Sequence, residues 1–440
     1  MSPPSVTVIG AGAAGLTAAI RAAEAGAQVR LLNAHPRIGL KILMSGGTRC
    51  NVTHREVSER DFNGGSRPFV ARVLRAFTVP QTIEWFTELG VPLKLEPTGK
   101  YFPESDDAQT VLHALLQGAQ RAGVKIEAGA RVIRLERRDA AAGGGFRLGI
   151  QSVTDSAALG AGVARSGQTE WPLPALKPEQ WIDSDRVILS TGGLSFPRTG
   201  SDGIGYALAC ALGHTLEPPV PALTPLASED PWCKELQGMT VEATLRLYAG
   251  GALEAEASGS LLFAHFGYSG PAALDLSRHW LRAGESGAER RVTASFIPGA
   301  REETLLAAWV EMAAHEPRAT VRAMLAGQLP DRLVTTICRD VEVDAGKMLS
   351  QISRVGRVRL AAALLSRLLP VTGTLGYEKA EVTAGGVRLA EANPSTLESR
   401  VAPGLYLCGE VVDVEGRLGG FNFQWGWSSG TVAGRAAAAK

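Results

Sequence analysis

The N-terminal run VTVIGAGAAG constrains the fold more than any other part of the chain. Its apolar residues Val6, Val8 and Ile9 predict a buried strand. Three glycines, Gly10, Gly12 and Gly15, predict a tight turn into a helix. A second predicted strand at 27–32 completes a βαβ unit within about 30 residues. Glycines at this spacing let backbone N–H groups and the helix N-terminus approach a pyrophosphate. The segment therefore predicts a dinucleotide-binding Rossmann unit.

The end of the second predicted strand bears on which dinucleotide binds. An acidic side chain at this point accepts hydrogen bonds from the adenosine ribose. This chain has Asn33 followed by Ala34, and an amide accepts one bond and donates another but carries no charge. Arg37 follows within a few residues, where a cation suits a 2′-phosphate. NAD, NADP and FAD therefore all stay open on this segment alone.

Composition narrows the class of protein. The 440 residues are 45% hydrophobic and 20% charged, with a formal net charge of +1, which is typical of a globular protein with two or three domains. The near-zero charge disfavours nucleic acid as a partner. The five cysteines are scattered and none is spaced CxxC, so no metal site is expected. Without a basic leader or an apolar run of about 18 residues, we expect a cytoplasmic protein with no membrane attachment.

Periodicity predicts further elements along the chain. We expect helices at 70–77, 81–89 and 107–122, a strand pair formed by VKIEAGARVIRLERR and GFRLGI, and a surface excursion over 152–180. Residues 215–300 are rich in predicted strands, including a hairpin in ATLRLYAGGALEAEASGSLLF, and residues 301–368 are predicted to be helical.

These elements predict a discontinuous architecture of the α/β class. Residues 1–195 and 376–440 would form a dinucleotide-binding domain from the two ends of the chain. Residues 196–300 and 369–375 would form an inserted, β-rich substrate domain, and residues 301–368 a helical subdomain.

Two later strands favour FAD over NAD. DRVILSTGG and GLYLCGE resemble the strands that accompany the N-terminal glycine motif in flavoproteins with two dinucleotide-binding domains. In those proteins the second strand typically ends in Gly-Asp, whereas this one ends in Gly409-Glu410. The resemblance places residues 419–423 against the isoalloxazine, next to the N-terminus of the last helix. For Trp425 and Trp427, which follow, the simpler expectation is core packing.

The run KILMSGGTRCN is dense in groups suited to a flavin edge. Gly46 and Gly47 permit close backbone approach, and Lys41 and Arg49 supply cations. Ser45 and Asn51 supply further polar groups for the pyrophosphate and the flavin carbonyls. A redox role for Cys50 is the weaker alternative, since small buried cysteines are common core residues.

Six motifs in order along the chain identify a family resemblance: PRIGLKILMSGGTRCNVT, STGGLSFPRTGSDGIGYALACALGH, PALTPL, LLFAHFGYSGPAAL, YEKAEVTAGGV and LCGEVVDVEGRLGGFNFQWGWSSG. The chain is similar to the HI0933-type (BaiN/RdsA-type) NAD(P)/FAD-dependent oxidoreductases. The resemblance implies an FAD domain of glutathione-reductase topology, an inserted β-barrel-like domain and a helical subdomain. Asn33 departs from the usual Glu of this family, and Thr48 departs from its third glycine.

The resemblance also implies that the strand beginning ARVIRLE contributes to the adenine site. The expected cofactor-binding residues are Gly10, Gly12, Ala13, Ala14, Gly15, Asn33, Ala34, Lys41, Ser45, Gly46, Gly47, Arg49, Cys50, Asn51, Arg131, Val132, Thr191, Gly192, Gly193, Gly409, Glu410, Gly419, Gly420, Phe421, Asn422 and Phe423.

The inserted domain is expected to supply the catalytic groups that face the substrate. In FAHFGYSGPAAL, His265 is a candidate general acid or base, and Tyr268 a candidate proton donor to an oxyanion. A structural turn with Ser269 capping a helix is the alternative for this run. Arg49 is a third candidate catalytic residue, beside the flavin. Arg198 and Thr199 in FPRTGSDG offer another site for an anionic substrate or a flavin edge.

The main hypothesis is an FAD-dependent oxidoreductase that passes hydride between non-covalent FAD and a small organic substrate. The sequence lacks a second GxGxxG unit, so if NAD(P)H reduces the flavin it must bind transiently over the ring, and oxygen or another acceptor as the physiological partner stays equally open. One alternative is an RNA-modifying or RNA-binding flavoprotein, and another is an FAD-binding redox sensor without turnover. The substrate and the oligomeric state stay open. The RNA alternative rests on the arginines of the predicted helical subdomain, Arg318, Arg322, Arg332, Arg339, Arg354, Arg357, Arg359 and Arg367.

Overall fold

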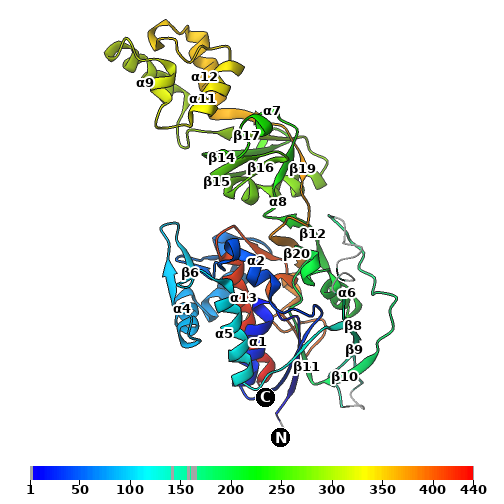
Figure 1. The fold of residues 1–440 in the computed structure, drawn as a ribbon. Coiled ribbons are helices and arrows are strands. Elements are labelled where there is room, and N and C mark those ends of the chain that lie inside the picture. Colours follow the sequence, from blue (N-terminus) through cyan, green and yellow to red (C-terminus); the bar gives the residue numbers. More distant parts are fainter. Residues whose placement is uncertain (1–2, 140–142, 156–158, 160–165, 440) are drawn as a thin grey trace. The chain divides into compact units, whose positions relative to one another are not determined.

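The computed structural model describes residues 3–139, 143–155, 159 and 166–439 (Figure 1). The chain divides into two compact units. The first unit combines the residues up to Pro221 with those from Ala380 onward, and the second spans Ala222–Lys379. Residues 196–221, which the sequence assigns to the inserted domain, belong here to the first unit, because their strand β12 (Leu216–Ala222) pairs with β20 (Val382–Val387).

A parallel five-stranded sheet forms the centre of the first unit. Its central strand, β1, pairs with β11 on one side and with β2 on the other. The strands in spatial order are β21 (Leu405–Leu407), β11 (Arg186–Leu189), β1 (Ser5–Ile9), β2 (Gln28–Asn33) and β7 (Lys125–Ala128). Strands from both ends of the chain thus share one sheet, which confirms the Rossmann-type α/β fold class predicted from the sequence.

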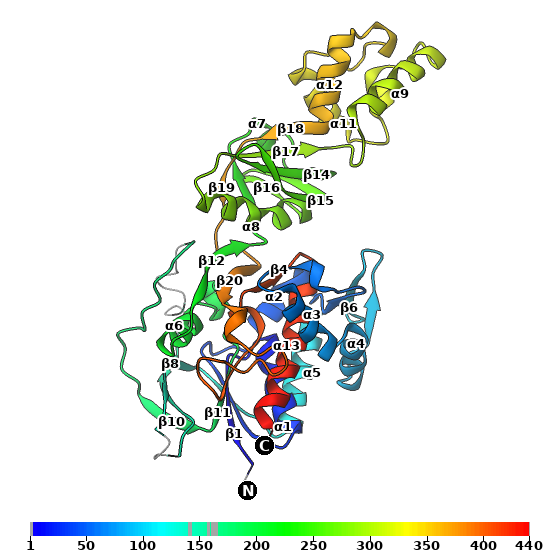
Figure 2. The ribbon, with the colours of Figure 1, turned by 180° about the vertical axis from the view of Figure 1, so that it is seen from behind.

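Helices α1 (Ala13–Glu24) and α13 (Phe421–Ala438) lie side by side in this unit (Figures 1 and 2). Their contact depends on glycines of α13 at four-residue spacing. A Cβ atom on Gly430 would lie 2.5 Å from the carbonyl oxygen of Ala14, and one on Gly434 would overlap that of Ala18. The two backbones can approach only because these positions carry no side chain.

The predicted strand over 124–138 is wrong as a single element. It divides at Gly129, whose φ is 72°, into β7 and β8 (Ala130–Arg137). Strand β7 joins the parallel sheet, whereas β8 pairs with β9 (Phe146–Ser152), as predicted for GFRLGI, and β9 with β10 (Gln180–Ser184). The predicted excursion at 152–180 includes residues 156–158 and 160–165, which lie outside the described residues.

The three helices predicted before residue 123 are confirmed with small shifts. They are α3 (Arg67–Ala76), α4 (Val79–Glu88) and α5 (Ala108–Arg121). Asp107 begins α5 by accepting a hydrogen bond from the backbone N–H of Gln109. The other elements of this unit are α2 (Leu40–Thr48), α6 (Ile204–Ala211), β3 (Thr53–His54), β4 (Phe62–Gly64), β5 (Leu93–Leu95), β6 (Lys100–Pro103) and β22 (Val414–Gly416).

The second unit is built on an antiparallel seven-stranded sheet. The strands in spatial order are β18 (Arg367–Leu369), β17 (Arg290–Ser295), β14 (Thr240–Ala249), β15 (Ala252–Ala264), β16 (Gly267–Ser269), β13 (Leu226–Ser228) and β19 (Val371–Thr374). The predicted hairpin is confirmed as β14 and β15, joined by Gly250 and Gly251 at positive φ. Only Pro370 separates β18 from β19, which are the two edges of the sheet, so the sheet must curl until its edges approach each other.

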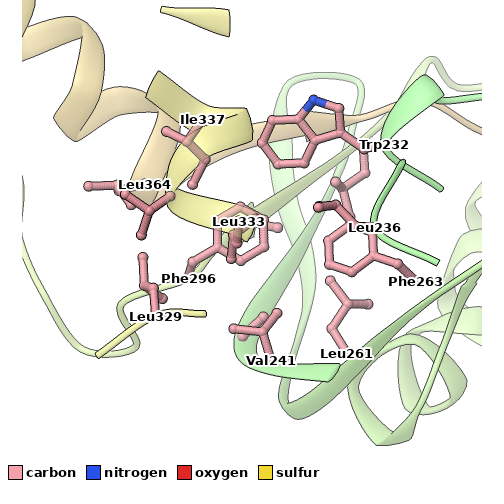
Figure 3. Close-up of a cluster of buried hydrophobic side chains, with 14 of the residues drawn as sticks. Trp232, Leu236, Val241, Leu261, Phe263, Phe296, Leu329, Leu333, Ile337 and Leu364 are labelled. Carbon is pink, nitrogen blue, oxygen red and sulfur yellow. The ribbon is translucent and has the colours of Figure 1, made fainter. Parts of the chain in front are cut away.

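Six helices complete the second unit in the part of the chain that the structure covers. They are α7 (Pro231–Glu235), α8 (Pro271–Glu285), α9 (Glu302–His315), α10 (Val321–Leu325), α11 (Asp331–Asp340) and α12 (Arg354–Ser366). Figure 3 shows that Phe296, next to β17, packs with Leu333 of α11 and Leu364 of α12. The predicted helices of 301–368 therefore share one apolar core with the sheet.

No helix of the described ranges combines the length and the apolar character that crossing a membrane requires.

Candidate functional site

The glycine turn between β1 and α1 has the geometry expected of a phosphate-binding loop. Gly10 has φ of 102°, and a Cβ atom there would lie 2.5 Å from the carbonyl oxygen of Ser190. A Cβ atom on Gly15 would overlap the carbonyl oxygen of Gly10. The backbone of the loop therefore packs directly against the backbone of the strand end and of the helix, which only glycine permits at these two positions.

Gly12 differs from its two partners because a Cβ atom there would meet nothing within 4 Å. The space beside the loop is therefore open. The first turn of α1 contains no acidic residue, and no side chain caps it. Its free N–H groups, at Ala13 and Ala14, and the positive end of the helix dipole suit a pyrophosphate. These residues fit the adenine dinucleotide expected from the sequence.

Asn33 uses both ends of its amide to shape this loop. Its Oδ1 accepts a hydrogen bond from the N–H of Ala11 at 3.1 Å, and its Nδ2 donates to the carbonyl oxygen of His35 at 2.6 Å. A weaker contact reaches the carbonyl oxygen of Arg37 at 3.4 Å. A carboxylate could not donate the last two bonds. The neutral amide therefore orders the segment around the half-buried Ala34.

The end of α2 and the residues that follow it have a strained, non-helical backbone. Gly46, Gly47, Thr48 and Cys50 all have positive φ, between 56° and 69°. Thr48 is β-branched, a residue type that rarely adopts this conformation. The base of the loop is fixed, since the Cys50 N–H donates to the Ser45 carbonyl oxygen at 3.1 Å. Gly46 to Thr48 are exposed. Strain of this kind is common at ligand-binding sites.

Arg49 is held by acidic residues of its own unit. Its Nη1 lies 2.6 Å from Oε1 of Glu96 and 3.3 Å from Oδ1 of Asp106, and its guanidinium stacks on Phe102 at 4.0 Å. The hydrogen bond to Glu96 raises the pKa of Arg49. Lys94 also pairs with Asp106. Arg49 is thus a fixed cation in a charged cluster at the surface.

Cys50 and Asn51 lie beneath the same loop. Burial raises the pKa of the Cys50 thiol to about 12, so the reactive thiolate is suppressed near neutral pH. Asn51 is buried, and its Oδ1 has no hydrogen-bond partner within the described part of the chain. That oxygen lies 2.7 Å from where a Cβ atom on Gly420 would stand. Gly420 is the N-cap of α13. Asn51 therefore brings the loop next to the start of that helix.

A polar network spans the strand ends of the parallel sheet. Lys41 Nζ donates to Ser195 Oγ at 2.7 Å and to Glu410 Oε2 at 2.9 Å. Ser195 Oγ donates to Glu410 Oε1 at 2.9 Å, and the Thr383 N–H donates to the same oxygen at 2.9 Å. A Cβ atom on Gly193 would lie 2.9 Å from this oxygen. Glu410, Gly192 and Gly193 therefore lie close to Lys41, and their binding of FAD stays a prediction.

The start of α13 is fixed by local contacts. Asn422 bonds both the N–H and the carbonyl oxygen of Gly416 at 2.8 Å. Phe421 is buried and stacks on His54 at 4.8 Å between ring centroids, while Phe423 stacks on Trp427 at 5.5 Å. Gly419, with φ of 137°, precedes them.

The two tryptophans of α13 are core residues, as expected. Trp425 donates its indole N–H to the carbonyl oxygen of Gly409 at 3.0 Å, and Trp427 donates to that of Val52 at 2.8 Å. Both side chains are buried.

The predicted adenine-site residues, Arg131 and Val132, lie on β8. Arg131 forms an ion pair with the buried Asp202, and Val132 is buried. Burial raises the pKa of Asp202, although the charge of Arg131 opposes the shift. Thr191 packs against the backbone of Gly205 in α6. Asp202, Ser195 and Thr383 are partners that no local motif indicated, since they lie far from Arg131 and Lys41 in sequence.

The candidate catalytic residues of the inserted segment belong to the second unit. His265 is exposed, and its ring contacts that of Phe266. Tyr268 is fully buried, and its hydroxyl donates to Oδ2 of Asp230 at 2.7 Å. Asp230 also accepts from Trp232 N at 3.1 Å. Burial raises the pKa of Tyr268 well above its usual range. Tyr268 is thus a hydrogen-bonded core residue in this structure.

Groups of three or more metal-ligating side chains are absent from residues 3–139, 143–155, 159 and 166–439.

Three relatives and structures show what the chain is similar to. It is 35% identical over 436 residues to the 3-dehydro-bile acid delta(4,6)-reductase of Clostridium scindens, covering 98% of each chain. It is 32% identical over 433 residues to the ribosomal RNA dihydrouridine synthase of Escherichia coli, covering 96% of this chain and 95% of the relative. The solved 3-ketosteroid-delta4-(5alpha)-dehydrogenase of Rhodococcus jostii matches 99% of this chain and 97% of that one, at 17% identity and a TM-score of 0.49.

The sequence profile of the HI0933-like protein Rossmann domain matches residues 4–172 and 149–436, which is nearly the whole chain. The relatives also align over nearly their full lengths. The chain therefore belongs to the HI0933-like family and is an FAD-dependent oxidoreductase.

Proposed function

We propose that this enzyme reduces a carbon–carbon double bond conjugated to a carbonyl group in a small molecule, with NAD(P)H as the electron donor. The names of the two relatives favour this chemistry. A 3-dehydro-delta(4,6) bile acid carries double bonds conjugated to a ketone. Uridine carries one conjugated to a ring carbonyl, and dihydrouridine is its reduced form. Different substrates thus share one reactive group.

The balance of the reaction is simple. When bound, FAD would supply the hydride for the β-carbon, with two electrons taken from NAD(P)H, and a protein group or water would hold the proton that goes to the α-carbon. The protein must then bind the cofactor, orient the carbonyl and hold a proton donor. His265 is the exposed candidate donor, because imidazole is a common general acid near neutral pH.

The open cradle at Gly12 is the observation that carries the cofactor assignment. The loop is packed tightly at Gly10 and Gly15 but is open at Gly12. Because Gly12 has no side chain, a phosphate can occupy the space that the side chain of any other residue would fill. Lys41, Glu410 and the N-terminus of α13 supply polar groups at the same carboxyl edge of the sheet, where such folds bind ligands.

The decisive experiment follows the visible absorbance of the purified, FAD-loaded protein under anaerobic conditions. NADH or NADPH is added first, and we expect one of them to bleach the flavin within seconds. A 3-oxo-4,6-diene bile acid is then added, with its saturated counterpart as control. Return of the flavin absorbance with the diene alone would support the proposal. Failure of both nicotinamides and the diene to change the spectrum would contradict it.

RNA is a second candidate substrate because of the Escherichia coli relative and the arginines of the helical part. Most of those arginines have partners: Arg322 pairs with Asp331, Arg339 with Glu235, Arg359 with Glu342 and Arg367 with Asp230, and Arg332 donates to the carbonyl oxygen of Glu235.

Three arginines stay available for phosphate. Arg318, Arg354 and Arg357 have no ion pair or hydrogen bond through their side chains to any residue that the structure describes. Unmodified ribosomal RNA transcript, added to the reduced enzyme in place of the diene, tests this substrate. Flavin reoxidation by the transcript, with binding that weakens steeply as salt rises, would favour RNA over the small molecule.

A further inference from the structure

Lys41 and Glu410 form an ion pair, and further hydrogen bonds hold the two charged groups against each other. Glu410 Oε2 takes the ammonium of Lys41 at 2.9 Å. Its Oε1 takes two donors, the Ser195 hydroxyl and the Thr383 N–H, each at 2.9 Å. The carboxylate therefore has three protein donors before any ligand binds.

The pair is only partly screened by water. The side chains of Lys41 and Glu410 are 25% and 19% exposed. A charge at such a site interacts with its neighbours more strongly than one on the open surface. Lys41 also lies next to glycine backbone, since its Nζ is 4.0 Å from where a Cβ atom on Gly192 would stand.

The ion pair lies at the carboxyl edge of the parallel sheet, where the cofactor is proposed to bind. Glu410 follows β21, Gly192 and Ser195 follow β11, and Lys41 belongs to the first turn of α2. Parallel strands that end together create the crevice where dinucleotides bind. A cation there favours the reduced form of a flavin, which carries more negative charge, and a carboxylate opposes that effect.

We propose that Lys41 and Glu410 act as an opposed charge pair that sets the reduction potential of bound FAD. Lys41 raises the potential, and Glu410 holds the ammonium in place while offsetting part of its charge. Both residues act on the cofactor through their charges and take no part in the reaction itself. The inference rests on the proposed FAD site.

The test measures the two-electron reduction potential of the FAD-loaded protein by equilibration with redox dyes. Lys41→Gln is expected to lower the potential, because it removes the cation and leaves the carboxylate. Glu410→Gln is expected to raise it. We expect each change to alter the affinity for reduced relative to oxidised FAD about tenfold, which corresponds to about 30 mV for a two-electron couple.

Two further variants separate charge from geometry. Ser195→Ala removes a hydrogen bond from both partners without changing charge, so the potential should stay close to that of the wild type. The double variant Lys41→Gln/Glu410→Gln should also return toward the wild-type potential.

The outcomes are distinct from those for the proposed function. Shifts of opposite sign in the single variants support the charge pair. Shifts of the same sign, or none, overturn it. If Glu410→Gln does not fold, the Lys41→Gln variant still decides, because an unchanged or raised potential contradicts the inference. A wild-type protein that cannot be loaded with FAD would instead remove the proposed function itself.

Discussion

Gly430 and the carbonyl oxygen of Ala14 approach so closely that a Cβ atom at residue 430 would lie only 2.5 Å from that oxygen. Gly426, one turn earlier on α13, differs: a Cβ atom there would have ordinary contacts of 3.6 Å with Ala13 and Ala14. Helices α13 and α1 therefore touch backbone to backbone at Gly430 but leave room for a methyl group at Gly426.

This difference predicts that alanine at the two positions has different effects on stability. Gly430→Ala should lower the free energy of unfolding by about 1–3 kcal/mol, because the helices must separate to admit the methyl group. Gly426→Ala should leave it unchanged or raise it by up to about 1 kcal/mol, since alanine favours the helix. Urea denaturation of both variants checks this. Equal losses in the two variants would show that the α1–α13 contact does not limit stability.

Gly12 allows cofactor binding to be separated from folding. Gly12 has φ of −85°, and the space around it is open. Gly12→Ala should therefore change the free energy of unfolding by no more than about 0.5 kcal/mol. The methyl group would occupy the phosphate approach, so FAD affinity should fall at least about tenfold. Fluorescence titration with FAD measures this.

The control for Gly12 is Gly373→Ala. Gly373 lies in β19 of the second unit, and a Cβ atom there would meet only the Ala227 side chain, at 3.9 Å. Both stability and FAD affinity should stay at the wild-type value. An unimpaired affinity in Gly12→Ala would place the pyrophosphate elsewhere.

Asn33 should not tolerate replacement by an acidic residue, although the family resemblance leads one to expect a Glu at this position. In Asn33→Asp a carboxylate would face the carbonyl oxygens of His35 and Arg37, which now accept bonds from the amide. The lost donor and the repulsion should cost about 1–3 kcal/mol of unfolding free energy. Chemical denaturation at neutral pH measures the loss. A variant as stable as the wild type, with tighter FAD binding, would show that the amide bonds are dispensable.

The parts of the site that the sequence predicts are those with local steric signatures. Gly10, Gly12 and Gly15 are spaced for one turn, so the loop could be recognised before its strands were paired. Gly129 shows the limit of local pattern. Its flanks alternate like one continuous strand, yet its positive φ and the nearby carbonyl oxygen of Val153 divide the segment between two sheets.

Partnerships across long sequence separations could not be predicted. Lys41 and Glu410 are 369 residues apart, and Arg131 and Asp202 are 71 apart. The sequence predicts a cofactor contact for Lys41, Glu410 and Arg131, because a sequence pattern does not show which charges the fold pairs. The same applies to Arg49, whose acidic partners Glu96 and Asp106 follow no motif.

Cys50 should make stability depend on alkaline pH. Its thiol has a pKa of about 12 in the folded protein and about 8.5 in an unfolded chain. Between these values the unfolded state releases the proton and the folded state keeps it, so stability is complete below about pH 8.5 and falls as pH rises. The slope from this group is about 1.4 kcal/mol per pH unit.

The Cys50→Ala variant isolates this term. A constant loss from the smaller side chain is expected at every pH, whereas the decline of unfolding free energy between about pH 9 and 10.5 should be shallower than in the wild type. Urea denaturation across this range measures both slopes. Parallel curves would contradict the buried, protonated thiol.

Tyr268 should prove structural rather than catalytic. Its hydroxyl donates to the buried Asp230, which would keep only Trp232 N and the more distant Arg367 as donors in Tyr268→Phe. The loss of that hydrogen bond should lower the free energy of unfolding by about 1–3 kcal/mol. Turnover with a working substrate should stay within a factor of about two, because a proton donor would instead account for about 10²–10⁴ in rate.

Tyr248→Phe is the matched control, since Tyr248 lies in the same sheet and its ring contacts Arg291. This control variant should alter neither the free energy of unfolding nor the turnover. A large loss of kcat in Tyr268→Phe at unchanged stability would restore Tyr268 as the acid, reached through a rearrangement that exposes its hydroxyl.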